Sequence, residues 1–280
     1  MKKLMVVSLL LVMFGVSAKA SWAVDYLPVK ANVAYSAVTA LDYKLPDDIV
    51  SYGADSLQTA SLWFADNSAK SDAPLVVLVH GGCWLNAYDI KHTFALSTAL
   101  AQSGYSVWSV EYRRTGDVGG GWPGSFEDVV KAIEQLTAYG KKPFSLANTV
   151  VVGHSAGGHL ALLAGAKLPE LAGVIGLAAI SDIEAYSLGQ NSCQQVTSQF
   201  MGGSAVDLPQ AYKEANPVAQ TLHSHTLLLQ GEADNIVPLA QATVPGVPAV
   251  MQADAGHFDW VHPGTPAFQT FLIQLNKVFK

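Results

Sequence analysis

Continuous apolar runs alternate with helix-like patterns along most of the chain. In 75–79 five apolar residues stand together, which is typical of a strand buried on both faces of a parallel sheet. Further strands are expected at 59–64, 105–112, 149–152, 171–180, 225–229 and 247–251. Helices are expected at 93–103, 125–139, 160–167 and 266–279, the second of them capped by Ser125 and closed by Gly140.

This alternation predicts an α/β fold with a mostly parallel central sheet and helices on both faces. The segment 183–223 interrupts it, because small polar residues dominate there and a weak helical pattern is confined to 209–215. We expect a short cap-like insertion, long enough to cover a site. The range 21–280 suits a single domain with one large core, around which 21–50 wraps as a leader.

The first twenty residues, 1–20, have the pattern of a secretory signal peptide. Lys2 and Lys3 precede an apolar run at 4–16, and small residues surround the expected cleavage site after Ala20. The apolar run is too short to span a membrane comfortably, so no stable membrane anchor is expected. The mature protein is therefore expected to be exported, to the periplasm or out of the cell.

Composition and export restrict the partners and the cysteine chemistry. Charged residues make up 14% of the chain, and removing Lys2, Lys3 and Lys19 leaves 13 basic against 22 acidic residues, a formal net charge of −9. Such an acidic chain without a basic patch excludes a nucleic-acid partner. Export exposes Cys83 and Cys193 to oxidising conditions, and the two cysteines fit either a disulfide or two buried thiols.

The stretch 150–161, VVVGHSAGGHLA, carries the main chemical signal. Ser155 stands between Gly153 and Gly157 where a β-branched run gives way to a helix-forming run. A nucleophilic serine needs a tight, strained turn, and glycines remove the Cβ atoms that would collide across it. The positive end of the following helix also points at the place where negative charge develops. This pattern predicts that Ser155 is a nucleophile.

Two partners for this serine follow in the order Ser, Asp, His, each just after an expected strand. Asp234 and His257 should meet Ser155, because ligands bind beyond the carboxyl ends of parallel strands. His257 would move the serine proton and Asp234 would orient the imidazole. The alternatives are Asp182 or Glu232 as the acid and His262 as the base; His154 and His159 are expected to be packing residues, and His92 carries no functional signal.

The stretch 80–84, HGGCW, gives a second signal. Glycines directly after a strand expose backbone N–H groups, so an oxyanion hole is expected from Gly81, Gly82 and Cys83 together with Ala156. Trp84 and Trp122 are candidate substrate contacts. The loop 119–124 around Trp122 matches G-x-G-x-x-G, but it does not follow a first strand and lacks an acidic residue about twenty positions later, so it is interpreted as part of the pocket wall.

The segments 80–84, 111–114 with 119–124, 153–161 and 257–259 together resemble the α/β-hydrolase superfamily. Within it, the chain resembles the esterase and lipase branch that holds kynurenine formamidase-like and acetyl or feruloyl esterase-like (BD-FAE-like) proteins, over roughly 51–280. The resemblance implies an α/β-hydrolase fold and a serine carboxylesterase that cleaves a small-molecule ester through an acyl-enzyme. No residue cluster has metal-ligand spacing, and no cofactor is expected.

Two rival functions stay open. A formamidase would use the same three residues on a formyl amide, although similar formamidases are generally cytosolic. A binding protein built on an inactive α/β-hydrolase fold would usually lack one of the three residues. The acyl group, the alcohol group and the oligomeric state are not identified by the residues.

Overall fold

The computed structural model of the chain describes residues 23–66, 73–140 and 144–280, so the expected signal peptide at 1–20 lies outside the described residues. Within them, eight strands form one sheet in the order β1-β2-β4-β3-β5-β6-β7-β8. The strands from β4 to β8 in this order run parallel, and at one edge β2 pairs antiparallel with β4 and β1 pairs antiparallel with β2. The strand bounds are β1 Asp48–Ser51, β2 Thr59–Trp63, β3 Leu75–Val79, β4 Ser106–Val110, β5 Thr149–His154, β6 Gly173–Leu177, β7 Thr226–Gly231 and β8 Ala249–Gln252.

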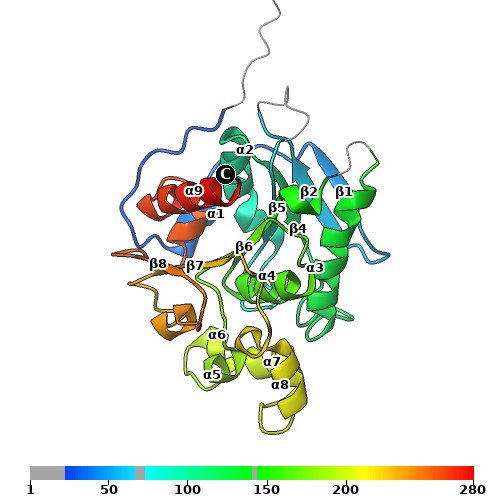
Figure 1. Cartoon of the computed structure of the whole chain (residues 1–280). Helices are drawn as coiled ribbons and strands as arrows, with labels where there is room; N and C mark the ends of the chain where they lie inside the picture. Colours follow the sequence, from blue (N-terminus) through cyan, green and yellow to red (C-terminus); the bar gives the residue numbers. More distant parts are fainter. Residues whose placement is uncertain (1–22, 67–72, 141–143) are drawn as a thin grey trace, which may run out of the picture.

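Helices cover both faces of the sheet (Figure 1). Val77 of β3 packs in one core cluster with α3 (Gly124–Glu134) and α4 (Ala156–Lys167). Its neighbour Val76 packs in the other with α2 (Phe94–Gln102) and α9 (Pro266–Val278). Successive side chains of a strand point to opposite faces, so a sheet covered on both faces needs the continuous apolar runs seen in the sequence. The predicted mostly parallel α/β fold is confirmed. Among the described residues, no helix is long and apolar enough to cross a membrane.

The segment 21–50, which was expected to wrap the domain as a leader, contains α1 (Tyr35–Thr39) and most of β1, elements too short to leave a periodic pattern. The predicted cap of the helix at 125–139 was wrong. Ser125 does not cap α3, which begins at Gly124. Instead its hydroxyl donates to the Arg113 carbonyl at 2.6 Å and accepts the Gly121 N–H at 3.1 Å, which closes the glycine-rich loop.

The expected insertion at 183–223 is more ordered than its composition indicated. It holds four short helices, α5 (Ile183–Ser187), α6 (Ser192–Gln195), α7 (Thr197–Met201) and α8 (Pro209–Ala215). Figure 1 shows them gathered at one end of the molecule, next to α4. The insertion follows the carboxyl end of β6, and ligands of open α/β sheets bind beyond these strand ends. Its position therefore suits a roof over a site.

Candidate active site

Ser155 occupies a strained turn between β5 and α4. Its φ of 55° and ψ of −122° are unusual for a residue with a Cβ, and its N–H donates to the Leu177 carbonyl at 2.9 Å. A Cβ on Gly153 would meet the Gly157 carbonyl, and one on Gly157 would meet the carbonyls of Val79 and His80. Both glycines are thus required by close backbone approach, and the turn has the geometry that the motif predicted.

The loop after β3 turns sharply beside this serine. Gly82, Cys83 and Trp84 all have positive φ, at 111°, 52° and 58°. Among the described residues, no protein acceptor is found for the backbone N–H groups of Gly82 and Cys83, nor for that of Ala156 at the start of α4. Free N–H groups next to a helix N-terminus are suited to bind an oxyanion.

Gly81 differs from its neighbours in the same loop. It does not line the cavity, and a Cβ on it would lie 2.9 Å from the His154 carbonyl and 3.1 Å from Ser155 Cβ. Its own carbonyl accepts a 2.8 Å hydrogen bond from His80 Nδ1. Gly81 therefore lets the loop pack against the serine turn.

Asp234 and His257 are brought together from the ends of β7 and β8. His257 Nδ1 lies 2.8 Å from Asp234 Oδ2, and Asp234 Oδ1 accepts the backbone N–H groups of Ile236 and Val237, each at 2.8 Å. A carboxylate accepts hydrogen bonds, so Nδ1 carries the proton and Nε2 is left as the basic nitrogen in the neutral ring. Both residues are buried, at 9% and 6% exposure.

The carboxylate of Asp234 is stabilised in its charged form. Burial by itself raises the pKa of Asp234, but the hydrogen bond and charge of His257 and the two backbone N–H groups outweigh this and lower the pKa below its ordinary value. Asp234 therefore stays ionised and able to hold the imidazole.

The alternative residues take other roles. The side chain of Asp182 is the N-cap of α5 and accepts the Ala185 N–H at 3.0 Å and Asn216 Nδ2 at 2.9 Å. His262 Nδ1 accepts the Gly264 N–H at 3.1 Å, and His262 does not line the cavity. Asp182 and His262 thus stabilise local structure, whereas His257 lines the cavity and Asp234 holds its ring from behind.

A cavity of about 240 Å³ joins these parts. Ser155 and His257 both line it, together with Gly82 and Cys83 of the loop after β3. None of its fourteen described lining residues is Lys, Arg, Asp or Glu, and most of the lining is apolar. Among the described residues, no group of three or more His, Cys, Asp or Glu could hold a metal ion. The arrangement suits chemistry on a neutral organic molecule.

His154 connects the serine turn to the histidine loop. Its Nε2–H donates to the His257 carbonyl at 2.9 Å, and the two rings lie 4.6 Å apart. Burial, and then the charge of His257, lower the pKa of His154 well below its ordinary value, so the ring stays neutral. The prediction of a packing role for His154 therefore missed a hydrogen bond that spans 103 residues of sequence.

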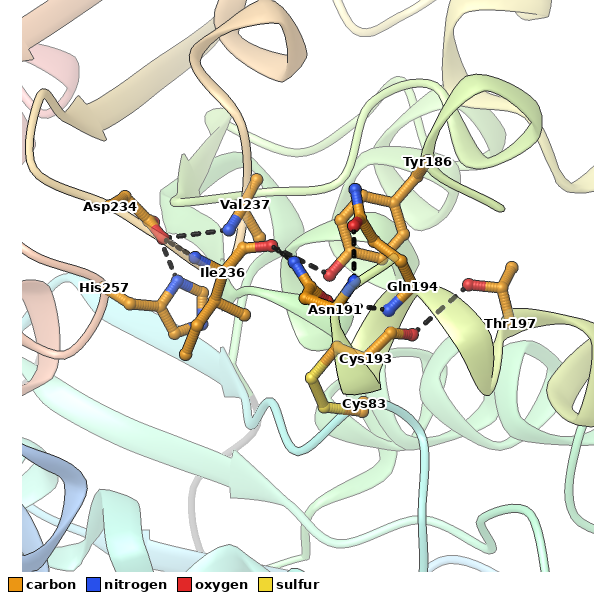
Figure 2. The surroundings of a disulfide bond; sticks show 10 residues. All are labelled: Cys83, Tyr186, Asn191, Cys193, Gln194, Thr197, Asp234, Ile236, Val237 and His257. Atoms are coloured by element: carbon orange, nitrogen blue, oxygen red, sulfur yellow. Dashed lines mark hydrogen bonds and ion pairs between the residues drawn. A yellow bond between two sulfur atoms is a disulfide. The ribbon is translucent and has the colours of Figure 1, made fainter. Parts of the chain in front are cut away.

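Cys83 and Cys193 form a disulfide, which decides between the two states that the sequence left open. Their Cα atoms are 5.1 Å apart. Figure 2 shows the bridge between the loop after β3 and α6 of the insertion, with Ile236 and His257 nearby. Both cysteines line the cavity, so the disulfide is part of its wall.

Neither tryptophan contacts the cavity, so their expected role as substrate contacts was wrong. Trp84 has 0% exposure and stacks on Phe200 of α7 at 4.7 Å. The ring of Trp122 stacks on Phe126 at 5.5 Å, and the backbone N–H of Trp122 donates to the Phe200 carbonyl at 2.8 Å. Both anchor the insertion, and the loop 119–124 supports α7 rather than the pocket wall.

Most of the residues that line the cavity were not predicted from the sequence. His92 was assigned no functional signal but lines the cavity, and burial lowers its pKa to about 3. The other lining residues without a predicted role come from separate parts of the chain, namely Tyr35, Leu85, Tyr88, Ser192, Val196, Ile236 and Phe258. Phe258 could have been found from its place beside His257, but the remaining residues have no local motif.

Comparison with known proteins places this chain among esterase-like sequences. A family model described as BD-FAE matches residues 63–244, more than half of the chain. Esterase LipC of Mycobacterium tuberculosis is 27% identical over 231 residues, which cover 75% of this chain and 57% of the relative. Kynurenine formamidase of Meyerozyma guilliermondii is 31% identical over 114 residues, which cover 41% and 40%. The chain spans about half the length of the curated relatives it matches.

Solved structures share the fold at low sequence identity. Esterase B from Lactobacillus rhamnosis matches with a TM-score of 0.71 and 20% identity, over 87% of this chain and 89% of that chain. A truncated carbohydrate esterase from gut microbiota matches with a TM-score of 0.68 and 19% identity, over 84% and 99%. These similarities show that the chain has the α/β-hydrolase fold.

Proposed function

The chain belongs to the BD-FAE family, and from this premise we propose that it is an exported serine carboxylesterase acting on small or medium esters. The proposal depends mainly on how His257 lies between Asp234 and the cavity. His257 is hydrogen-bonded to the buried Asp234 carboxylate at 2.8 Å, and its ring lines the same cavity as Ser155 on its strained turn. The relatives named as esterases support this choice of reaction.

In the proposed reaction, Ser155 Oγ attacks the ester carbonyl carbon while His257 Nε2 takes the hydroxyl proton. Asp234 holds the ring in the required tautomer and stabilises the imidazolium. The bond between the carbonyl carbon and the alcohol oxygen then breaks, and His257 gives its proton to that oxygen. A water molecule next attacks the acyl-enzyme with His257 as the base, which releases the acid and regenerates the serine.

The negative oxygen of each tetrahedral intermediate would be held by the N–H groups of Gly82, Cys83 and Ala156. The lack of a protein acceptor for these groups among the described residues supports this role. Losing one such donor typically costs about a hundred- to a thousandfold in rate. Because the donors belong to the backbone, the disulfide at Cys83 leaves its N–H available.

The cavity favours neutral substrates. Taking a charged group out of water without an ionic partner is costly, and the lining contains no Lys, Arg, Asp or Glu among its described residues. N-formylkynurenine carries an ammonium and a carboxylate, so this lining argues against the formamidase alternative. Because a kynurenine formamidase is among the relatives, a formamide is still included among the substrates to be tested.

The test is hydrolysis of p-nitrophenyl acetate to octanoate, methyl ferulate, acetylated xylan and N-formylkynurenine by the purified protein. We expect the neutral esters to be cleaved and Ser155→Ala to lose all measurable activity. The matched control is Ser187→Ala on the surface helix α5, where the hydroxyl donates to the Glu184 carbonyl at 2.7 Å, and this variant should keep wild-type rates. Cleavage of the formamide alone would contradict the esterase proposal, and no cleavage of any substrate would favour a binding protein.

Export is proposed with the esterase activity. The signal-peptide pattern at 1–20 supports it, and so does the disulfide between Cys83 and Cys193, since disulfides persist in oxidising compartments. Expression of the full chain in a secreting host should yield a protein that begins near Ser21. An intact mass that still includes 1–20 would contradict the proposal.

A further inference from the structure

Tyr35 brings the N-terminal segment into the cavity that holds Ser155 and His257. Its ring lies 5.3 Å from the ring of Phe258 and 5.7 Å from the ring of Tyr88. We call Tyr35, Tyr88 and Phe258 the aromatic wall, and all three line the cavity. Tyr35 precedes the matched family range of 63–244, so this part of the wall is a feature of the present chain outside that range.

A buried carboxylate fixes Tyr35 in this place. Asp259 has 0% exposure and accepts the backbone N–H groups of Asn32 at 2.6 Å and Val33 at 3.0 Å. The same carboxylate accepts the N–H of Gly256, the residue before His257. The Asp259 carboxylate therefore holds the segment just before α1 against the loop that carries His257. The same carboxylate thus helps to position both Tyr35 and His257.

We propose that the aromatic wall binds the alcohol part of the ester and that Tyr35 contacts it directly. This inference rests on the proposed esterase function. When the bond between the carbonyl carbon and the alcohol oxygen breaks, His257 must give its proton to that oxygen, so the alcohol begins next to the imidazole. The ring of Phe258 lies 5.0 Å from the ring of His257, and Tyr35 continues the surface from there.

The wall selects alcohols with a flat apolar or aromatic body. Aromatic side chains provide large contact surfaces and prefer ring neighbours in offset-stacked or edge-to-face arrangements, and Tyr35 and Tyr88 already form an edge-to-face pair. It carries no charge that would attract an ionic alcohol. Benzyl esters should therefore be better substrates than ethyl esters of the same acid, since the two alcohols are leaving groups of similar quality.

The test compares kcat/KM for phenyl, benzyl and ethyl acetate in wild type, Tyr35→Leu and Tyr35→Phe. Tyr35→Leu should lower kcat/KM for the two aromatic esters by about five- to tenfold and for ethyl acetate by less than about twofold. Tyr35→Phe keeps the ring and should stay within about twofold on all three esters. The matched control is Tyr43→Leu, a tyrosine of the same N-terminal segment that packs on Phe94 at 5.3 Å and does not line the cavity.

A second series, phenyl acetate, propionate and butyrate, tests whether Tyr35 affects binding of the alcohol part or of the acyl part. The order of preference among these acids should be the same in Tyr35→Leu and wild type. A change in that order, or an equal loss on ethyl and phenyl acetate, would overturn the proposal. If circular dichroism shows that Tyr35→Leu is not folded, Tyr88→Leu is tested in its place, and the same pattern of losses is expected. Failure of the esterase proposal itself would be recognised separately, by a wild type that cleaves no ester or a Ser155→Ala that still does.

Discussion

Two residues that lie far from His257 in the sequence hold it in place. Asp234 accepts its Nδ1–H at 2.8 Å, and His154 donates to its backbone carbonyl at 2.9 Å. The first contact sets the tautomer of the ring, and the second sets the position of the backbone that carries it. The proposed proton transfer needs both, because proton transfer depends on a ring within hydrogen-bond reach of the reacting oxygens.

Asp234→Asn should lower kcat by about 10³- to 10⁴-fold while the protein stays folded. An amide at this position can donate a hydrogen bond to Nδ1, which would place the imidazole proton on Nε2 and remove the base. The measurement is kcat for p-nitrophenyl acetate with the concentration of folded protein checked by circular dichroism.

The control is Asp182→Asn, which makes the same substitution at an aspartate that follows the neighbouring strand β6 in the sequence. Asparagine is also a good N-cap, so the cap of α5 is retained and kcat should change by less than about threefold. Similar losses in both variants would show that Asp234 has no special role in the reaction.

The residues that the sequence predicted best are those with a local reason for their position. Ser155 needs glycines on both sides of a strained turn, and this requirement is visible within five residues. Tyr35 reaches the cavity because the fold brings its segment to Asp259 and its ring to Phe258, both more than 200 positions away, and nothing in its own neighbourhood reveals this. Trp84 was misassigned because a motif cannot show which side of a loop faces the core.

At the scale of elements, the disulfide joins the loop after β3 to α6 of the insertion. The loop supplies the N–H groups of Gly82 and Cys83, which have no acceptor in the part of the chain that the structure describes, and α6 supplies Ser192 and Cys193 to the cavity wall. The two elements therefore hold each other in place across the cavity.

Reduction of the disulfide should lower kcat/KM by about tenfold or more before the protein unfolds. Once the bridge is broken, the loop after β3 loses a fixed neighbour, and a small misplacement of catalytic groups can cost about a hundredfold in rate. The unfolding free energy should also fall by about 2–5 kcal/mol, measured by urea unfolding.

The control is the double variant Cys83→Ala with Cys193→Ala, which should start from the low activity and show no further loss with reductant. Full activity of the reduced wild type, with free thiols verified by mass, would show that the disulfide contributes to stability alone.

The prediction of elements succeeded where tertiary structure requires a continuous apolar pattern. The buried strand β3 needs five apolar residues because helices cover both of its faces. In the insertion, the weak helical pattern at 209–215 corresponds to α8, but α5, α6 and α7 escaped prediction because four or five residues are too few for a helical period to be visible. Pairing of Cys83 with Cys193 across 110 residues likewise depends on the folded arrangement.

Of the buried histidines in the described part of the chain, three should make the whole molecule sensitive to acid, because burial keeps their rings neutral. Burial lowers the pKa of His92 to about 3 and that of His159 to about 4, and burial followed by the charge of His257 lowers the pKa of His154 well below its ordinary value. His159 Nε2 donates to the Ala215 carbonyl at 2.7 Å, which ties α4 to the insertion. These rings stay neutral in the folded state at pH values where they would be charged in the unfolded state.

The free energy of unfolding should therefore fall as the pH falls from about 6.5 toward 4. In this window the unfolded chain binds protons that the folded chain does not, and each such histidine contributes a slope of about 1.4 kcal/mol per pH unit. Urea unfolding at pH 7, 6 and 5 measures the slope. His159→Gln removes one of the three groups and should give a shallower slope, whereas an equal free energy of unfolding at pH 7 and pH 5 would contradict the account.

The most direct measurement of the central claim is covalent labelling with a p-nitrophenyl phosphonate, followed by intact mass and peptide mapping. If Ser155 is the nucleophile, each chain takes one phosphonyl group, on Ser155, with no adduct in Ser155→Ala and slower labelling in His257→Ala. A folded protein that takes no label, or takes it on another residue, would contradict the assignment of Ser155 as the nucleophile.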